Sequence, residues 1–517
     1  MRIRASHLVI ATCAVVFLGG MLAMRQSTGE GNAPEGPRKS AWQKVEQSLR
    51  EGRPKSAASA LEGLVEEAIA DGAWAEVARG IATRVLAETG DRPADDPERL
   101  IQLDAAIAAA PAACRPVLEA VAANWTWNYF LANRWRFAQR TRGAAASDDL
   151  ATIGQWDLPL IIAEIERRFE RAGDAAEQLR LLPTDEWTAI IDPGVVRFGP
   201  RGNRGDITPD EVARAVALRP TVWDVLMANA VAFFTSGERG LVAPEGAFEP
   251  DAAGPLLEGR DSFLAWNPAD KTSDTGSPVL KAILLYQTWL RGHQDDADPA
   301  PRLAIDLERI QWAVDVAVGE SREQRSNEAL EGFIQEAGDH ELASRGRAAL
   351  AERLIQQDDP AAAHAVASEG AAAHPDSVGG AECRNLISRI EARSLGLATE
   401  RTWAEPWPVI QASYTNLARL HLRVMKANWE ERLEAGRPEW QWLEVADRER
   451  ILAAKPVRSF AADLPATLDY RQRHHDIPVP KNLPPGCYWV VASGKGRLLS
   501  ERQRGQRLLC VGQPAGP

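Results

Sequence analysis

The chain has 517 residues, 45% of them hydrophobic, which is enough to build several packed domains and excludes a wholly disordered protein. Its 60 Lys and Arg residues against 72 Asp and Glu residues give a net charge of −12, which argues against a nucleic-acid-binding surface along the whole chain. Five cysteines are too few for a fold held together by disulfide bonds. Composition alone predicts a large acidic globular protein and no particular activity.

Residues 1–25 resemble a membrane segment. Leu8–Met24 carries no charged residue, and Arg2 and Arg4 precede it. Because the small residues of a signal-peptidase site are missing, we expect an uncleaved signal anchor with both arginines on the cytoplasmic side. A cleaved signal peptide and a buried core helix are the alternatives. The anchor predicts an inner-membrane protein with the bulk of the chain extracytoplasmic or periplasmic, or a secreted protein if the signal is cleaved.

Residues 26–40 are rich in Gly, with Pro and Ser, and are expected to form a flexible tether. Export would place four cysteines in a compartment that permits disulfide bonds, and four cysteines allow three pairings. They are Cys114, Cys383, Cys487 and Cys510. Only Cys487 and Cys510 lie in one candidate β-domain and could form a bridge there, but isolated buried thiols are the favoured interpretation.

Residues 41–395 have the pattern of helices. In several stretches apolar residues recur at spacings of three and four residues, which places them on one face of a helix. These stripes are Val117, Val121, Trp125, Tyr129 and Ala132; Ile283, Tyr286 and Leu290; and Leu303, Leu307, Ile310 and Val314. Asp306, Glu308 and Arg309 fall off the last stripe. Leu241–Ser277, rich in Pro, Gly and Asp, is predicted to be a long surface loop.

A helical hairpin is predicted near the end of this region. A helix over Leu342–Ile355 is followed by Asp-Asp-Pro at 358–360, a start signal with Pro near the first helical position. The second helix ends at His374, which Pro375 follows. The hairpin has the form of a tetratricopeptide (TPR) repeat, although no strict repeat period is found elsewhere. The fold class expected is therefore mainly α, an irregular helical-hairpin (TPR-like) solenoid followed by a β-sandwich.

The β-sandwich module is expected over residues 396–517. Leu420–Met425 alternates with period two, and Cys487–Ala492 follows a Pro-Pro-Gly turn, as strands do. Residues 429–454 return to helical spacing, which indicates a helical insertion between strands. No closing strand is evident beyond 508–511, which would leave the module incomplete, with an unpaired edge.

No catalytic, cofactor-binding or metal-binding motif stands out, so the sequence predicts a protein that is not an enzyme and uses no cofactor. The glycine motifs of phosphate-binding loops and the G-x-S-x-G motif are missing. His340-Glu341 begins like a zinc-protease helix, but the second ligand position holds Ser344. His474 and His475 are adjacent and would point to opposite faces of a strand, which is poor geometry for a metal.

The densest unusual feature is a group of aromatic residues around Trp125, Trp127 and Trp135, in a chain with 17 Trp, 11 Phe and 5 Tyr. A platform for a ligand or a glycan could have this composition. Trp125 and Tyr129 lie on an apolar stripe, however, which favours packing in the core.

Residues of the same group resemble a known family. Asn128-Tyr129-Phe130 and 133–137 look like the N-terminal helical region of large bacterial alpha-2-macroglobulin-like proteins. Further segments resemble that region in the same order: 139–141, 156–159, 219–224, 281–287, 306–309, 383–387 and 399–400. Asp469-Tyr470 and 483–493, with a P-G-x-Y entry into a strand, are similar to the first macroglobulin β-domain. The resemblance covers nearly the whole chain after the tether.

The resemblance implies an envelope-exposed member of a family that traps and inhibits endopeptidases. In that family a protease cuts a bait segment, the molecule rearranges, and many members tether the attacker through a Cys–Gln thioester. The chain departs from this pattern, because none of the four cysteines beyond the anchor has the C-x-E-Q arrangement. Family members are also several times longer, and the bait region and later macroglobulin domains are absent here.

Two functions follow as expectations. The first is the N-terminal portion of an alpha-2-macroglobulin-like inhibitor, from a split gene or a truncated frame. The second is a membrane-anchored helical-repeat scaffold whose curved surface binds other envelope proteins. In both cases the expected partners are proteins, proteases or envelope proteins, and the membrane through the N-terminal segment, with no nucleic acid.

Overall fold

The computed structural model describes residues 38–90, 96–140, 149–191, 208–237, 248–272, 274, 276–400, 402–427, 445–494 and 509–512. The predicted anchor over Leu8–Met24 and nearly all of the predicted tether lie outside these ranges. Within them, none of the helices has the length and the hydropathy needed to span a lipid bilayer.

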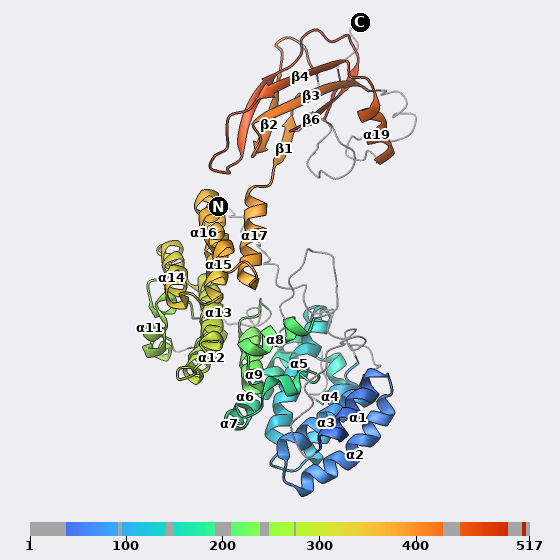
Figure 1. The fold of residues 1–517 in the computed structure, drawn as a ribbon, viewed down its shortest axis with the longest axis vertical. Helices are drawn as coiled ribbons and strands as arrows, with labels where there is room; N and C mark the ends of the chain where they lie inside the picture. The colour runs from blue at the N-terminus through green and yellow to red at the C-terminus, as the bar shows by residue number, and fades with distance from the viewer. Residues whose placement is uncertain are drawn as a thin grey trace. The chain divides into compact units, whose positions relative to one another are not determined.

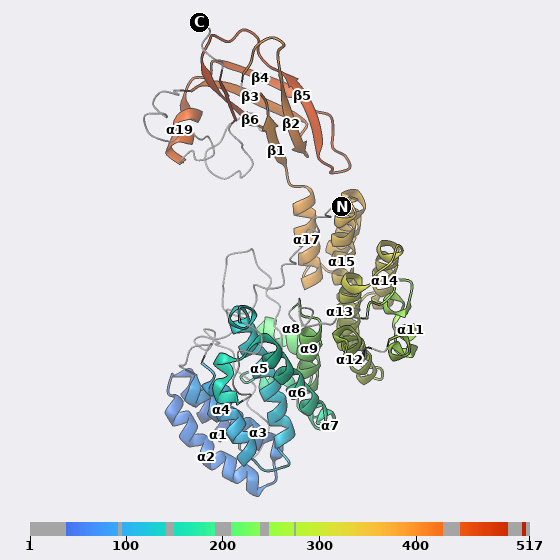
Figure 2. The same cartoon turned by 180° about the vertical axis from the view of Figure 1, so that it is seen from behind.

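The described chain is mainly helical, and its strands lie in the C-terminal region, where they form antiparallel sheets (Figures 1 and 2). Two compact units divide between Phe333 and Ile334, inside helix α14 (Arg322–Ala337). The predicted change from helices to strands at residues 395 and 396 is a different boundary, because the last helices belong to the same compact unit as the strands.

The first unit is built from helices and short 3₁₀ turns. Its α-helices are α1 (Lys39–Arg50), α2 (Pro54–Ala70), α3 (Trp74–Thr89), α4 (Glu98–Ala109), α5 (Arg115–Ala138), α6 (Leu158–Gly173), α7 (Ala176–Leu179), α8 (Pro209–Leu218), α9 (Val222–Phe234), α11 (Arg260–Ala265), α12 (Pro278–Gly292) and α13 (Ala300–Val316). The 3₁₀ turns are η2 (Leu150–Gln155), η3 (Thr184–Trp187), η4 (Pro255–Leu257) and η5 (Pro268–Lys271).

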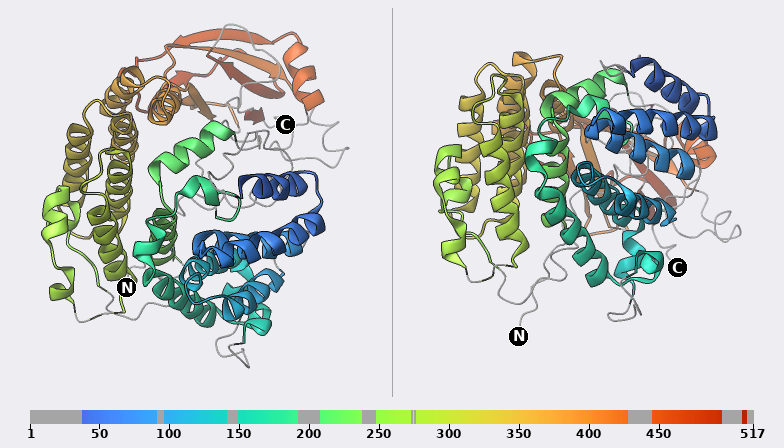
Figure 3. Two further views of the ribbon diagram at one scale, coloured as in Figure 1. Left: turned by 60° about the horizontal axis from the view of Figure 1, so that its bottom comes forward. Right: turned by 90° about the horizontal axis from the view of Figure 1, so that it is seen from below.

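Neighbouring helices pack in chain order through α6, as in consecutive hairpins, and Figure 3 shows the blue and cyan helices side by side. The order then changes, because α9 packs on α5, α6 and α12, and α8 packs on α13. The predicted stripes are buried as expected, including Leu303, Leu307 and Val314. Ala132 is the exception in the stripe of α5, where it is exposed.

The prediction of a long surface loop over Leu241–Ser277 is wrong for its described part. η4, α11 and η5 lie in this stretch and pack on α12 and α13. Leu256, Leu257 and Phe263 are buried there. Prolines and glycines keep these helical segments to a turn or two, which hides their periodicity, but their few apolar side chains still reach the core.

Three helices begin the second unit: α15 (Leu342–Gln356), α16 (Pro360–Ala373) and α17 (Val378–Ile390), here called the helical trio. The first two form the predicted hairpin, which is confirmed. Two glycines at the start of α17 allow the chain to pass close to other backbone. A Cβ on Gly379 would lie 2.3 Å from Arg345 N, and one on Gly380 would lie 2.0 Å from His374 O.

The described residues after these helices form seven strands and helix α19 (Val445–Ala453), which we call the β-module. They are β1 (Ser394–Ala398), β2 (Val409–Thr415), β3 (Arg419–Lys426), β4 (Arg458–Asp463), β5 (Arg473–Pro478), β6 (Cys487–Ser493) and β7 (Leu509–Gly512). Their order is β1-β2-β5 in one sheet and β4-β3-β6-β7 in the other. The predicted strands over Leu420–Met425 and Cys487–Ala492 are confirmed.

One core lies between the two sheets, and a second lies on the outer side of the larger sheet. Ile410 of β2, Leu422 of β3 and Val490 of β6 belong to the first core. Trp489 of β6 is buried in the second, against Ile451 of α19. β6 is therefore covered on both faces, which a simple two-sheet sandwich would not require.

Candidate functional site

One group of buried titratable side chains surrounds Asp224, near the start of α9. Thr221 caps this helix with a capping box, in which Thr221 N and Oγ1 donate to Asp224 Oδ2 at 2.9 and 2.8 Å. Trp289 Nε1, on α12, donates to the other oxygen, Oδ1, at 2.9 Å. Asp224 is fully buried, so its charge depends on these donors.

His293 completes this cluster from the residue after α12. Its Nε2 lies 2.7 Å from Asp224 Oδ1, and its Nδ1 lies 2.6 Å from Asp296 Oδ2. Two carboxylate acceptors at these distances require two N–H donors, so the ring is an imidazolium. A ring with both nitrogens engaged has no lone pair for a substrate proton. The geometry therefore suits a clamp between helices and not a general base.

The charges of the clamp explain its pKa shifts. Burial lowers the pKa of His293, but the hydrogen bonds and charges of Asp224 and Asp296 outweigh burial, and the pKa is raised. Burial likewise raises the pKa of Asp224, but the hydrogen bond and charge of His293 outweigh it, and the pKa is lowered. The clamp is strongest where both groups are charged.

Stability should therefore fall as this histidine loses its proton. A raised histidine pKa contributes stability that is fully present below the unfolded value of about 6.5 and is lost as the pH rises through the folded value. We expect the difference in unfolding free energy between the wild type and the His293→Gln variant to shrink as the pH rises above about 6.5 and through the raised pKa of His293. Urea unfolding of both proteins at each pH measures this difference. The titration of the other histidines contributes equally to both proteins and therefore cancels in the difference. A constant difference would contradict an imidazolium at His293.

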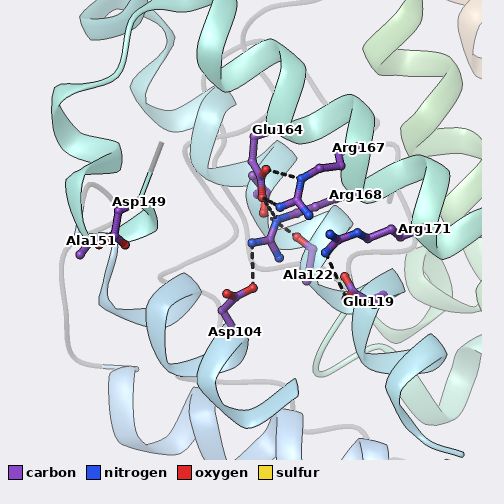
Figure 4. Close-up of polar contacts among 10 residues, drawn as sticks. Asp104, Glu119, Ala122, Asp149, Ala151, Glu164, Arg167, Arg168 and Arg171 are labelled. Atoms are coloured by element: carbon purple, nitrogen blue, oxygen red, sulfur yellow. Dashed lines mark hydrogen bonds and ion pairs between the residues drawn. The ribbon is translucent and has the colours of Figure 1, made fainter. Parts of the chain in front are cut away.

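A second polar cluster holds α6 against its neighbours (Figure 4). Arg168, which is buried, donates through Nε to Glu164 Oε1 at 2.6 Å and through Nη2 to Asp104 Oδ1 of α4 at 3.0 Å. Arg171, one turn further along α6, lies 3.7 Å from Glu119 of α5. Carboxylates of the protein already neutralise these arginines, so the cluster joins three helices and does not resemble an open anion site.

A third cluster includes residues that fall off the predicted stripe of α13. Asp306 and Arg309 are both buried, and Arg309 Nε donates to Asp306 Oδ1 at 2.7 Å. Arg309 Nη1 also donates to Leu256 O at 2.7 Å, and its guanidinium lies 4.6 Å from the ring centre of Phe263. Asp306 and Arg309 are three residues apart, about one helical turn, in a helix with an apolar stripe. That spacing of opposite charges is the one sequence pattern that could have predicted the buried ion pair.

Core packing is confirmed for most of the aromatic group on α5. Trp125, Trp127 and Tyr129 are buried, and Trp125 Nε1 donates to Ile190 O at 3.0 Å. Trp135 differs, because 69% of it is exposed, with the guanidinium of Arg134 at 5.4 Å from its ring centre. The sequence did not predict that Trp135 would be exposed while the other aromatic residues of the group are buried, since all of them lie in one helix.

The zinc-like motif beginning at His340 leads to a structural contact. Ser344 is fully buried in α15, and its Oγ lies 2.9 Å from both Gly370 O and His374 Nδ1. His374 Nε2 in turn lies 2.9 Å from Asp339 O. The ring thus meets a backbone carbonyl where a catalytic triad would place a carboxylate, and a buried serine cannot reach a substrate. The contacts tie α15 to the end of α16.

The adjacent histidines of β5 lie as the period of a strand predicts. His474 is exposed and His475 is half-buried, opposite Ser413 and Ala412 of β2 respectively. Across the described ranges, no group of three or more His, Cys, Asp and Glu side chains is arranged to hold a metal ion.

Three of the cysteines are described with their side chains, and all three are free thiols. Cys114 and Cys383 are buried, and Cys487 is half-buried. Burial raises the pKa of Cys383 to about 11, which keeps the thiol protonated and unreactive. These observations agree with the interpretation of isolated thiols.

The strand register argues against a bridge within the β-module. β6 and β7 pair so that Cys487 lies opposite Gly512, while Cys510 lies opposite Trp489. The two cysteines are therefore diagonal neighbours, whose Cα atoms are about 7–8 Å apart in antiparallel sheets. A disulfide usually spans less than about 7 Å between Cα atoms, so this pairing would need a shifted register.

Comparison of the chain with protein-family models, with curated proteins and with solved structures gives no match. The clusters around Asp224, Arg168 and Arg309 join helices, and each charged group in them faces a partner within the protein.

Proposed function

We propose that the chain is a protein-binding component of the bacterial cell envelope, built like the N-terminal portion of an alpha-2-macroglobulin-like endopeptidase inhibitor. Residues 1–25 would hold it in the inner membrane, with the bulk of the chain on the extracytoplasmic side. The observation that carries the proposal is the order of the parts, in which helical hairpins lead directly into a module of two antiparallel sheets. The motifs that resemble the family run through these parts in the same order.

The arrangement of the strands supports a macroglobulin-type module. The first, second and fifth strands form one sheet and the remaining four form the other, a three-on-four arrangement found in immunoglobulin-like sandwiches. The P-G-x-Y segment on which the resemblance partly rests comes at the entry to β6. Tyr488 is buried there, and its hydroxyl donates to Pro484 O at 2.5 Å. The residues that carry the resemblance thus build the turn before the strand.

An inhibition assay tests the proposed place of this chain in a larger trap. Because no cysteine has the thioester arrangement and no bait region is recognisable, the chain alone is expected to leave cleavage of a protein substrate by an endopeptidase unchanged. A complete macroglobulin-type inhibitor in the same assay is the control. Strong inhibition by the chain alone would contradict the absence of the trapping parts.

The DNA beyond the codon for Pro517 tests whether this chain is the N-terminal portion of a longer alpha-2-macroglobulin-like inhibitor. Macroglobulin-like strands and a C-x-E-Q run encoded there, in any frame, would support the proposal. An unrelated gene on the opposite strand would count against it.

A helical-repeat scaffold for envelope proteins is the second candidate, and exposed apolar side chains on the first unit favour it. Leu181 is 81% exposed, and Trp135 lies on the surface as described above. Exposed tryptophans are over-represented where proteins bind one another. Binding of defined envelope proteins that disappears when residues 41–395 are removed would favour the scaffold over the inhibitor.

A further inference from the structure

Left-handed backbone conformations gather at one place in the second unit. Three non-glycine residues in the described ranges have positive φ: Asp358 at 59°, Asn416 at 58° and Tyr470 at 57°. They come from the α15–α16 turn, the β2–β3 turn and the β4–β5 connection. Each makes a contact between the helical trio and the β-module, and this region is called the joint below.

The connection between the two parts is short. α17 ends at Ile390 and β1 begins at Ser394, so that only residues 391–393 intervene, and all three are exposed (Figure 1). Asn416 caps this connection, because its Nδ2 donates to Ile390 O at 2.8 Å and to Ala392 O at 3.2 Å. Asparagine adopts positive φ readily, so this contact costs little strain. Residues 391–393 thus form a pivot with one fixed point.

The other side of the joint is made by Tyr470 and Arg471. The Tyr470 ring stacks on His364 of α16, with ring centres 4.8 Å apart and planes 17° apart. His364 is itself held by Glu391, 2.9 Å from its Nε2. Arg471 Nη2 donates to Asp358 O, and its Nε lies 3.6 Å from Asp358 Oδ2. Tyr470 and Arg471 thus join the β4–β5 connection to α16 and to the α15–α16 turn, and Glu391 of the pivot supports His364.

Tyr470 is strained in this position. A bulky aromatic residue at positive φ is an outlier that persists only where its surroundings hold it there. The stack on His364 and the packing of Tyr470 against the apolar cluster of the helical trio supply that restraint, while the Arg471–Asp358 pair, 47% and 83% exposed, adds little. One aromatic stack, this apolar packing and one surface pair therefore oppose the strain of Tyr470 and hold the docked arrangement.

We propose that Tyr470 and Arg471 form a releasable latch that holds the β-module against the helical trio, and that the module swings about residues 391–393 when the latch opens. Once the stack on His364 is broken, Tyr470 can leave its left-handed conformation. The release of that backbone strain favours the open arrangement. The latch acts within the second unit and does not depend on the function proposed above.

Distances between spin labels in the full chain test the latch. Labels at Glu369 on α16 and Asp463 on β4 suit the purpose, because these side chains are 72% and 82% exposed. Attachment through non-canonical amino acids avoids the native cysteines. The wild type is expected to give one narrow distance distribution. Tyr470→Ala and His364→Ala, each of which removes half of the stack, are expected to shift it to longer and broader distances.

Leu468→Ala is the matched control, because Leu468 lies in the same loop and is 89% exposed. It should leave the distribution unchanged. Arg471→Ala, at a half-exposed position that tolerates truncation, gives a second route to opening if Tyr470→Ala fails to fold, and should produce a smaller shift in the same direction. A wild type that is already broad, or variants as narrow as the wild type, would overturn the proposal.

Discussion

Replacing Asp224 with alanine is expected to lower the free energy of unfolding of the first unit by about 3–5 kcal/mol, the cost of breaking a buried ion pair by removing one partner. The variant leaves the His293 imidazolium without its buried partner and removes the acceptor of Trp289 Nε1. It also removes one half of the capping box with Thr221.

Urea unfolding followed by tryptophan fluorescence measures this change, since Trp289 contacts the site directly. Asp261→Ala is the matched control, because the side chain of Asp261 is 94% exposed on α11. Its effect should stay within about 0.5 kcal/mol. An Asp224→Ala variant as stable as the control would mean that the clamp contributes nothing to the packing of α9 on α12.

A methyl group at Gly380 is expected to be nearly as damaging to the second unit. Its Cβ would lie 2.0 Å from His374 O, so the backbone has to move. That carbonyl also accepts hydrogen bonds from Ser377 N and Oγ, at 3.2 and 2.9 Å, and Ser377 caps α17. Gly380→Ala should therefore cost about 3 kcal/mol, through overpacking and loss of the cap.

Gly332→Ala is the control for adding a methyl group to a helix, because Gly332 lies in helix α14, at the end of the first unit, and a Cβ there would meet nothing within 4 Å. Alanine at an open helical position should stabilise by about 0.5–1 kcal/mol. Thermal unfolding of both variants compares them directly. Equal melting temperatures for the two variants would show that the backbone around His374 can move to accommodate the methyl group without loss of stability.

The sequence predicted those features whose physical cause lies within a single helix, hairpin or strand. The stripe from Leu303 to Val314 and the hairpin around Pro360 follow from helical periodicity and local start signals. Strand β3 follows from alternation. In each case the physical cause lies within about four residues along the chain, which is the range that periodicity and capping report.

The features that the sequence did not predict depend on distant residues. His293 and Asp224 are 69 positions apart, and no local pattern connects them. Asp306 and Arg309 look like solvent-facing charges until Leu256 and Phe263 are placed against them. Short strands such as β1 and β5 lack clear alternation, since an edge strand is specified by the neighbour it pairs with more than by its own residues.

The burial of β6 on both faces limits which amino-acid substitutions this strand can accept. Residues from Tyr488 to Ser493 are all buried, so a polar replacement at any of them enters one core or the other. β5 has alternating burial over much of its length, and His474 and Asp476 can change freely on the solvent side. In a set of natural variants, β6 should therefore accept only exchanges of similar volume, while β5 should vary at every second position.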